Sequence, residues 1–368
     1  MRNLKQLMFR GFINALIAFF CGGTASAQSP QTPEINPMNV LFIGNSFTHM
    51  NSMPVMFERL AISKNIKINV LMSAKSNHTF EMHSKRADLY EDIHKAKWDY
   101  VVLQGFSREF SYGQEHIDTA VIPYFQQIVD TLYQNNPCVK LLLYMTWGYE
   151  NGYAYMNEIG TYEEMSAAIE SGYRYIAGKY NLAIVPVGNV WKEIRKNYPE
   201  YNLYQKDQHH PTKIGSYIVA SSFYSAIFRS SPEGGYTAGL DDKMALNIQR
   251  TAYSYVKDHL SEYNLDSNIV EVSYKFTNEG KYEAVCYANY PEATSIKWEF
   301  GDNTAASTHA RVVHHYKTFG NYKVKLTVQD ACGERIIYKN VHFKEPYKPK
   351  APTTSQPKTK DTSIKKRI

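Results

Sequence analysis

The fold is decided by the segment Val40-Leu41-Phe42-Ile43-Gly44-Asn45-Ser46-Phe47-Thr48, in which an apolar run stops at a Gly-Asn-Ser triplet. An apolar run of this length is typical of a buried β-strand. The triplet predicts a tight turn at the end of that strand, with the Ser46 hydroxyl on the turn. Nucleophilic side chains are often displayed in this way, so the segment indicates both a strand and a candidate reactive residue.

Four more apolar runs of strand length follow, and amphipathic segments separate them. The expected strands are Asn39 to Ile43, Ile66 to Met72, Tyr100 to Leu103, Val139 to Met145 and Leu182 to Val187. The expected helices are Pro54 to Lys64, Ile117 to Asn135 and Tyr162 to Tyr180, followed by Pro211 to Ser230 and Asp241 to Tyr263. This alternation predicts an α/β domain with a parallel sheet covered by helices on both faces. Its site is expected at the carboxyl ends of the strands, where Ser46, Gln104 and Trp147 fall.

A second polar block, Asp207-Gln208-His209-His210-Pro211-Thr212, lies about 160 residues after Ser46. Serine becomes a nucleophile when a base takes its proton, and histidine acts as that base when a carboxylate fixes its tautomer. Ser46, His210 and Asp207 could fill these roles. We favour His210 over its neighbour His209 as the base because His210 directly precedes the proline.

Composition limits the class of protein. The chain has 368 residues, of which 43% are hydrophobic and 21% charged, so it can form one enzyme-sized domain and a smaller module. The net charge of +6 comes largely from a lysine-rich C-terminal tail, so the folded part is close to neutral and nucleic-acid binding is not indicated.

The N-terminus predicts export. Basic residues precede the apolar stretch Phe12 to Phe20, and small residues end at Ala27, which together describe a signal peptide over residues 1–27 with cleavage after Ala27. A membrane anchor is the alternative, but the stretch is shorter than the roughly 20 residues that span a bilayer. No later segment has the length to span one, so the mature chain is expected to have no transmembrane segment, and its location to be periplasmic or extracellular.

Export would permit disulfide bonds. After cleavage three cysteines remain, and a bond between Cys286 and Cys332 would leave Cys138 as a buried thiol. The odd number leaves other pairings open.

The two polar blocks resemble the first and last motifs of the SGNH hydrolases, also called GDSL-like esterases, over roughly residues 38–263. The segment from Trp98 to Ser107 contains Gln104-Gly105-Phe106-Ser107, similar to the Gln-Gly-x-Ser form of the third motif in sialate and xylan O-acetylesterases. The resemblance implies a flavodoxin-like three-layer fold. It also implies that Ser46 is the nucleophile, that Asp207 and His210 are its partners, and that Gln104 donates a hydrogen bond to the oxyanion. Gln104 could instead cap a helix.

One motif departs from the family pattern. The second motif normally contains a glycine whose N–H completes the oxyanion hole, whereas this chain has Ser76-Asn77-His78-Thr79-Phe80. The N–H of Asn77 or of His78 could serve, together with the N–H of Ser46, if the backbone allows it. Losing one donor would cost roughly 3 kcal/mol of transition-state stabilisation.

Aromatic residues follow the fourth expected strand, and Trp147 and Tyr149 are candidates for stacking on a sugar. Packing in the core is the alternative. The histidines His49, His78 and His83 lack the i, i+4 spacing of a helical metal site, so neither a metal nor a cofactor is expected.

From about residue 268 the chain changes to short alternating strands, which predict a small all-β sandwich of the immunoglobulin type. The segments Ile296 to Asn303 and His315 to Val328 resemble the PKD domain, with Asn303 in place of a glycine. We assign residues 268–344 to this module and residues 345–368 to a disordered basic tail. The resemblance implies a spacer or a polysaccharide-docking unit without chemistry of its own.

The combined expectation is an exported serine esterase that removes acetyl or short acyl groups from a glycan or another small ester. The alternative is a catalytically silent glycan-binding or surface-interaction protein, which the missing glycine of the second motif would favour.

Overall fold

The computed structural model describes residues 36–267 and 269–345. The predicted signal peptide lies outside the described residues, as does nearly all of the predicted tail. Within the described part of the chain, no helix combines the length and the hydrophobicity needed to cross a bilayer.

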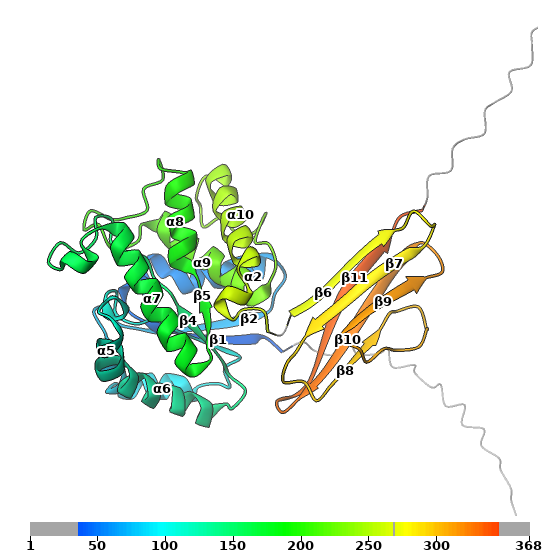
Figure 1. The fold of residues 1–368 in the computed structure, drawn as a ribbon, viewed down its shortest axis with the longest axis horizontal. Coiled ribbons are helices and arrows are strands. Elements are labelled where there is room, and N and C mark those ends of the chain that lie inside the picture. The colour runs from blue at the N-terminus through cyan, green and yellow to red at the C-terminus, as the bar shows by residue number, and fades with distance from the viewer. Residues whose placement is uncertain (1–35, 268, 346–368) are drawn as a thin grey trace, which may run out of the picture. The chain divides into compact units, whose positions relative to one another are not determined.

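The first part of the chain forms an α/β domain (Figure 1). Its elements are, in order, β1 (Met38–Gly44), α1 (Ser46–His49), η1 (Met50–Ser52), α2 (Met53–Ser63), β2 (Ile68–Ala74), α3 (Phe80–Ser84), α4 (Ala87–His94), β3 (Tyr100–Leu103), η2 (Glu109–Ser111), α5 (Gln114–His116), η3 (Ile117–Val121), α6 (Ile122–Asn135), β4 (Lys140–Tyr144), η4 (Asn157–Ile159), α7 (Tyr162–Tyr180), β5 (Ala183–Val185), α8 (Val187–Asn197), α9 (Lys213–Phe228), α10 (Asp242–Asp258) and η5 (Ser261–Tyr263).

The five strands form one parallel sheet in the order β2-β1-β3-β4-β5. The helices α2, α8, α9 and α10 cover one face, while α6 lies on the other (Figure 1). This is the flavodoxin-like order, and the chain changes direction across the sheet between β1 and β3. A crevice is therefore expected beyond the carboxyl ends of these two strands, next to Ser46 and Gln104.

Burial explains why these segments form their elements. Residues Val40 to Ile43 of β1 are fully buried, as a central strand between two helical layers requires. Helix α9 is apolar or small on every side, and it is buried from Gly215 to Ile227 because it packs between the sheet and the neighbouring helices α2, α8 and α10. Thr212 caps this helix by accepting a hydrogen bond from the N–H of Gly215.

The second part of the chain forms two three-stranded antiparallel sheets, with the orders β11-β10-β8 and β6-β7-β9. The strands are β6 (Ile269–Phe276), β7 (Tyr282–Asn289), β8 (Ser295–Glu299), β9 (Arg311–Tyr316), β10 (Gly320–Asp330) and β11 (Gly333–Phe343). Trp298 and Phe300 are 0% and 3% exposed, so both belong to the core of this sandwich. Asn303 has a φ of 61°, the left-handed conformation that glycine or asparagine adopts most readily. The predicted fold class is confirmed in both parts.

Of the cysteine pairings that the sequence left open, Cys286 with Cys332 is not the one that forms. The disulfide joins Cys138 to Cys332, with a Cα–Cα distance of 5.6 Å, and Cys286 is a free thiol. Cys286 lies on β7 with its side chain fully buried in the sandwich core, whereas Cys332 lies in the turn between β10 and β11. Burial raises the pKa of the Cys286 thiol to about 11, so this residue behaves as a small apolar side chain.

Candidate active site

The turn after β1 displays Ser46 through a set of hydrogen bonds around Asn45. The Asn45 N–H donates to Gln104 Oε1 at 2.9 Å, and Asn45 Oδ1 accepts from the Phe47 N–H at 3.1 Å, which caps α1. A side chain at Gly44 would come within 2.6 Å of Gln104 Oε1, so only glycine fits there. Ser46 is therefore the first residue of α1, where its own N–H has no partner within the helix.

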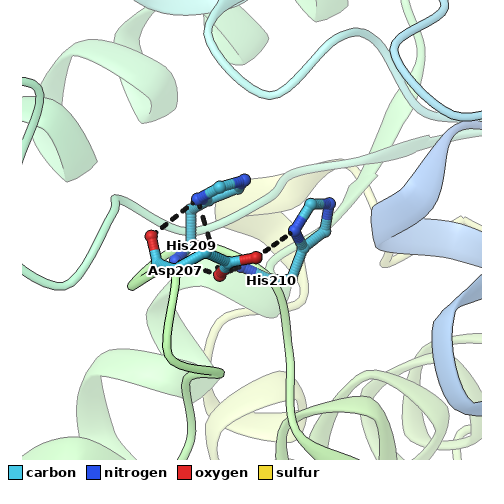
Figure 2. A group of neighbouring side chains, drawn as sticks. All are labelled: Asp207, His209 and His210. Atoms are coloured by element: carbon cyan, nitrogen blue, oxygen red, sulfur yellow. Dashed lines mark hydrogen bonds and ion pairs between the residues drawn. The ribbon is translucent and has the colours of Figure 1, made fainter.

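The loop before α9 brings an acid and an imidazole to the same place. Asp207 Oδ1 accepts from the N–H groups of His209 and His210 at 3.1 and 3.0 Å. Asp207 Oδ2 lies 2.7 Å from His210 Nδ1, and Figure 2 shows this contact with both imidazole rings on the same side of the loop. The left-handed conformation of Gln208, at a φ of 64°, turns the chain back so that these contacts can form.

Ser46 and His210 meet although 164 residues separate them: Ser46 Oγ lies 2.8 Å from His210 Nε2. Burial raises the pKa of Asp207, but hydrogen bonds from the side chain and backbone of His210 and from the backbone of His209 outweigh it and lower the pKa to about 2. An ionised carboxylate only accepts hydrogen bonds, so His210 Nδ1 carries the proton. His210 Nε2 is then free to accept the hydrogen bond of the Ser46 hydroxyl.

These side chains border a cavity of about 370 Å³, a size within the range of small-molecule sites. The cavity is lined by Asn45, Ser46, Phe47, Asn77, Phe106, Ser107, Arg108, Tyr149, Tyr153, Asp207, His209 and His210. Of the predicted site residues, Ser46, Asp207, His210, Asn77 and Tyr149 lie on it. Gln104 and Trp147 do not.

The position of Gln104 differs from the predicted role as a hydrogen-bond donor to the oxyanion. Its side chain is fully buried, and its Oε1 accepts hydrogen bonds from the Asn45 N–H at 2.9 Å and the Thr48 hydroxyl at 2.8 Å. Its Nε2 donates to the carbonyl of Gly105. The oxygen and the nitrogen of the amide thus both form hydrogen bonds within the protein, next to the turn that carries Ser46. Gln104 supports that turn instead of presenting a donor to the cavity.

The position of Trp147 also differs from the prediction that it stacks on a sugar, and agrees with the alternative of packing in the core. It is fully buried and stacked between Phe47 and Trp191, with ring centroids 4.5 and 4.1 Å apart and planes within 4° of parallel. Its indole N–H donates to the carbonyl of His209. Trp147, one of the aromatic residues after β4, therefore belongs to the core. There it packs against Phe47, which lines the cavity, and holds the loop that carries His210.

Asn77, in the segment that resembles the second motif but lacks its glycine, has a left-handed backbone conformation. Its φ is 60°, which asparagine tolerates better than most residues. It lines the cavity, and the N–H groups of Asn77 and Ser46 donate a hydrogen bond to no acceptor within residues 36–267 or 269–345. Both residues line the cavity, so these two N–H groups are candidate donors to a bound ligand.

Tyr149 forms one wall of the cavity. Its hydroxyl lies 2.7 Å from Ser107 Oγ, and its ring centroid is 4.9 Å from that of His209. Burial raises the pKa of the Tyr149 phenol, so it stays protonated and can donate a hydrogen bond. Tyr149 therefore lines the cavity with a protonated hydroxyl, and its contact with a substrate stays a prediction.

Glu109 is a supporting residue that the sequence reading missed. It is 3% exposed, and its carboxyl group accepts from the Phe106 N–H at 2.8 Å and from the Phe80 N–H at 3.4 Å. It thereby ties the segment that follows β3 to the segment that carries Asn77. The available signal was a charged residue only six positions past the end of β3.

The pH dependence of stability is expected to report on Glu109. Burial raises its pKa to about 7 from a usual value of 4.5, against the opposing effect of its two backbone hydrogen bonds. Between these values the folded protein keeps a proton that the unfolded chain has released. The free energy of unfolding therefore falls as pH rises through this window, by about 3 kcal/mol for a shift of this size. Glu109→Gln should lack this decrease.

Urea unfolding of the wild type and of Glu109→Gln, at pH 5 and at pH 8, measures the difference. Comparing the two proteins cancels the contributions of other titrating groups, among them the buried His83. Parallel pH profiles would contradict the assignment.

The cluster drawn in Figure 2 also has the composition of a metal site. Asp207, His209 and His210 offer ligand atoms within 4.8 Å of one another. However, Asp207 Oδ2 and both ring nitrogens of His210 already form the hydrogen bonds described above. A metal ion would have to displace those hydrogen bonds to bind there.

Comparison with known families concerns the two parts of the chain separately. Residues 287–340 match the sequence model of the PKD domain. The C-terminal sandwich is a PKD domain. Asn303, which stands in place of a glycine in the motif that this segment resembles, lies within the matched residues and has the left-handed conformation noted above. No curated protein matches the chain.

Solved structures resemble the α/β domain that precedes the PKD domain. A DUF4886 family protein from Bacteroides uniformis is 18% identical, with a TM-score of 0.51 over 60% of this chain and 95% of its own. A protein from Slackia heliotrinireducens, proposed to be an SGNH hydrolase, is 23% identical over 52% of this chain and 98% of its own, with a TM-score of 0.40. An acetyl xylan esterase from Geobacillus stearothermophilus is 19% identical over 50% of this chain and 92% of its own, with a TM-score of 0.36.

These similarities concern the fold. Proteins named as SGNH hydrolases and acetyl xylan esterases are among the solved structures. At identities this low, a shared fold does not carry an activity from one protein to another.

Proposed function

We propose that the protein is an exported serine esterase that hydrolyses O-acetyl or other short acyl esters, with a carbohydrate as the alcohol. The observation that carries the proposal is a continuous chain of hydrogen bonds. Ser46 Oγ lies 2.8 Å from His210 Nε2, and His210 Nδ1 lies 2.7 Å from Asp207 Oδ2. This is the arrangement in which a histidine can take the proton of a serine hydroxyl.

The reaction follows from these roles. Ser46 Oγ attacks the ester carbonyl while His210 Nε2 accepts its proton, and the Asp207 carboxylate stabilises the imidazolium that forms. The backbone N–H groups of Ser46 and Asn77 supply the donors to the tetrahedral oxyanion. His210 then returns the proton to the leaving sugar hydroxyl. Water, activated by the same histidine, hydrolyses the acyl-enzyme.

The cavity favours a small polar ester over a long acyl chain. It measures about 370 Å³ and is bordered by the hydroxyl groups of Ser107 and Tyr149 and by the ring of Tyr153. Hydroxyl groups and tyrosine rings of this kind suit a sugar. Export is supported by the Cys138–Cys332 disulfide, since such bonds persist in oxidising compartments. Polysaccharide docking by the PKD domain belongs to the same proposal.

The rival reading, a catalytically silent glycan-binding protein, depended on the missing second-motif glycine. Asn77 adopts the left-handed conformation and its N–H is unoccupied among the described residues, which removes that support.

A fluorophosphonate probe tests the proposal, because covalent labelling requires an activated serine. We expect stoichiometric labelling of the native protein, with the added mass on the peptide that contains Ser46 and none after heat denaturation. Release of acetate from a panel of acetylated polysaccharides would then identify the glycan. A native protein that stays unlabelled at Ser46 would refute the esterase.

A further inference from the structure

Arg108 is a cation inside the candidate active site with no task in the proposed chemistry. It lines the same cavity as Ser46, and among the described residues that line it Arg108 is the only arginine or lysine. Nothing in ester hydrolysis by a serine requires a guanidinium at this place. Its presence therefore needs a separate explanation.

Its surroundings hold the side chain in place without neutralising it. The guanidinium carbon lies 4.0 Å from the ring centroid of Tyr153 and 5.4 Å from that of Phe106, both within the range of cation–π contacts. No carboxylate within residues 36–267 or 269–345 forms an ion pair with it. Asp207, the acid that lines the same cavity, is engaged with His210, and the neighbouring residue Glu109 accepts from two backbone N–H groups.

One of its donors is buried and unsatisfied. Arg108 Nε has no hydrogen-bond partner in the described structure although solvent does not reach it. A buried donor on a charged group costs free energy unless an acceptor is supplied. Arg108 nevertheless lines the cavity, and a guanidinium presents parallel N–H groups that match a planar anion such as a carboxylate.

We propose that Arg108 binds an acidic group of the substrate, so that the preferred ester is an O-acylated sugar bearing a carboxylate, such as a uronic acid. The inference rests on the proposed esterase function and names its substrate class. A sphere with the volume of the cavity, about 370 Å³, has a diameter of about 9 Å, so the ester at Ser46 and the anion at Arg108 belong to one sugar unit. Tyr153, on which the guanidinium stacks, fixes the position of the anion.

The test compares three esters that differ in one group: an acetylated methyl glucuronoside, the matching methyl glucoside and its 6-sulfate. For the wild type we expect kcat/KM for the glucuronoside to exceed that for the glucoside at least tenfold, with the preference falling as salt is added. Arg108→Gln should lower this ratio of kcat/KM values to about one. Arg108→Lys should keep part of the preference, because lysine retains the positive charge but lacks the paired N–H groups of the guanidinium. A larger preference for the sulfate would assign the same site to a sulfated sugar.

A matched control is Arg59→Gln, because Arg59 also stacks on a tyrosine, Tyr236, but lies outside the cavity. It should keep the wild-type ratio. Binding of the glucuronoside to Ser46→Ala, measured by calorimetry with and without Arg108→Gln, gives a readout that needs no catalysis.

The outcomes separate the two proposals. If the wild type cleaves p-nitrophenyl acetate but treats the charged and neutral sugars alike, the acidic substrate is overturned and the esterase stands. Equal losses on all three esters in Arg108→Gln would make Arg108 a support for Tyr153 and overturn the inference as well. If no ester is cleaved, the esterase itself fails, and the calorimetric comparison alone decides the role of Arg108.

Discussion

Replacing Ser46 with alanine is expected to lower kcat for p-nitrophenyl acetate by at least roughly 10⁴-fold, since removing a serine nucleophile has effects of that size or larger. The substitution removes the Ser46 hydroxyl, which lies 2.8 Å from His210 Nε2 and is the proposed attacking group. Ser46 is the first residue of α1 and is capped by Asn45, so the alanine variant keeps the hydrogen bonds that form the turn. Release of p-nitrophenol, corrected for spontaneous hydrolysis, measures the effect.

Ser273→Ala is the control, because Ser273 is an exposed serine on β6 in the PKD domain. It should retain full activity. Thermal unfolding of both variants should match the wild type within a few degrees. An active Ser46→Ala enzyme with the wild-type unfolding temperature would mean that another group is the nucleophile.

Asp207→Asn is expected to lower kcat by roughly 10³ to 10⁴-fold, because the amide can donate to His210 Nδ1 and so move the imidazole proton to Nε2. With that tautomer, His210 can no longer accept the proton of Ser46. The variant also loses the negative charge that stabilises the imidazolium. The rate of fluorophosphonate labelling at Ser46 should fall with kcat, since both depend on the same proton transfer.

Asp241→Asn is a matched control for this change. Asp241 caps α10 by accepting from the Met244 N–H, and asparagine caps a helix about as well as aspartate. Activity and stability should stay within experimental error of the wild type. Retention of more than about a tenth of the activity in Asp207→Asn would show that Asp207 does not orient the base.

Most of the strands and helices could be predicted from the hydrophobic pattern of the sequence. The strand Tyr100–Leu103 and the helix Tyr162–Tyr180 have the predicted bounds, because a buried strand and a helix with a Thr161–Glu164 capping box both leave clear local signals. The prediction fails at Val187, which begins α8 instead of ending a strand. The bend at Pro186 comes directly after β5, and an apolar run alone does not reveal where the chain turns.

The polar residues of the site could be predicted for a different reason. Ser46 lies two residues after Gly44 and His210 directly precedes Pro211, and both glycine and proline have strong conformational preferences. The places of Ser46 on a turn and of His210 before a helix could therefore be predicted from local sequence. Trp147 and Gln104 could not be placed in this way. A residue that directly follows a strand must lie at the edge of the sheet. The direction of its side chain, however, depends on packing partners that are distant in sequence, such as Trp191 for Trp147.

The disulfide shows the same limit. Cys138 and Cys332 are 194 residues apart, and nothing local to either one indicates the pairing. Cys286 and Cys332 looked like partners because they share one module. The alternation of β7 puts Cys286 inside the core, and Cys332 occupies a turn.

Asn77 and Asn303 both stand where the motifs that this sequence resembles have glycine, and their φ angles are 60° and 61°. A strict pattern that demands glycine would reject the chain at Asn77, whereas the PKD sequence model matches residues 287–340 with Asn303 included. Searches that use such strict patterns should therefore admit asparagine wherever the template residue is left-handed. Chains set aside as degenerate for want of that glycine would then be recovered as candidates for assay.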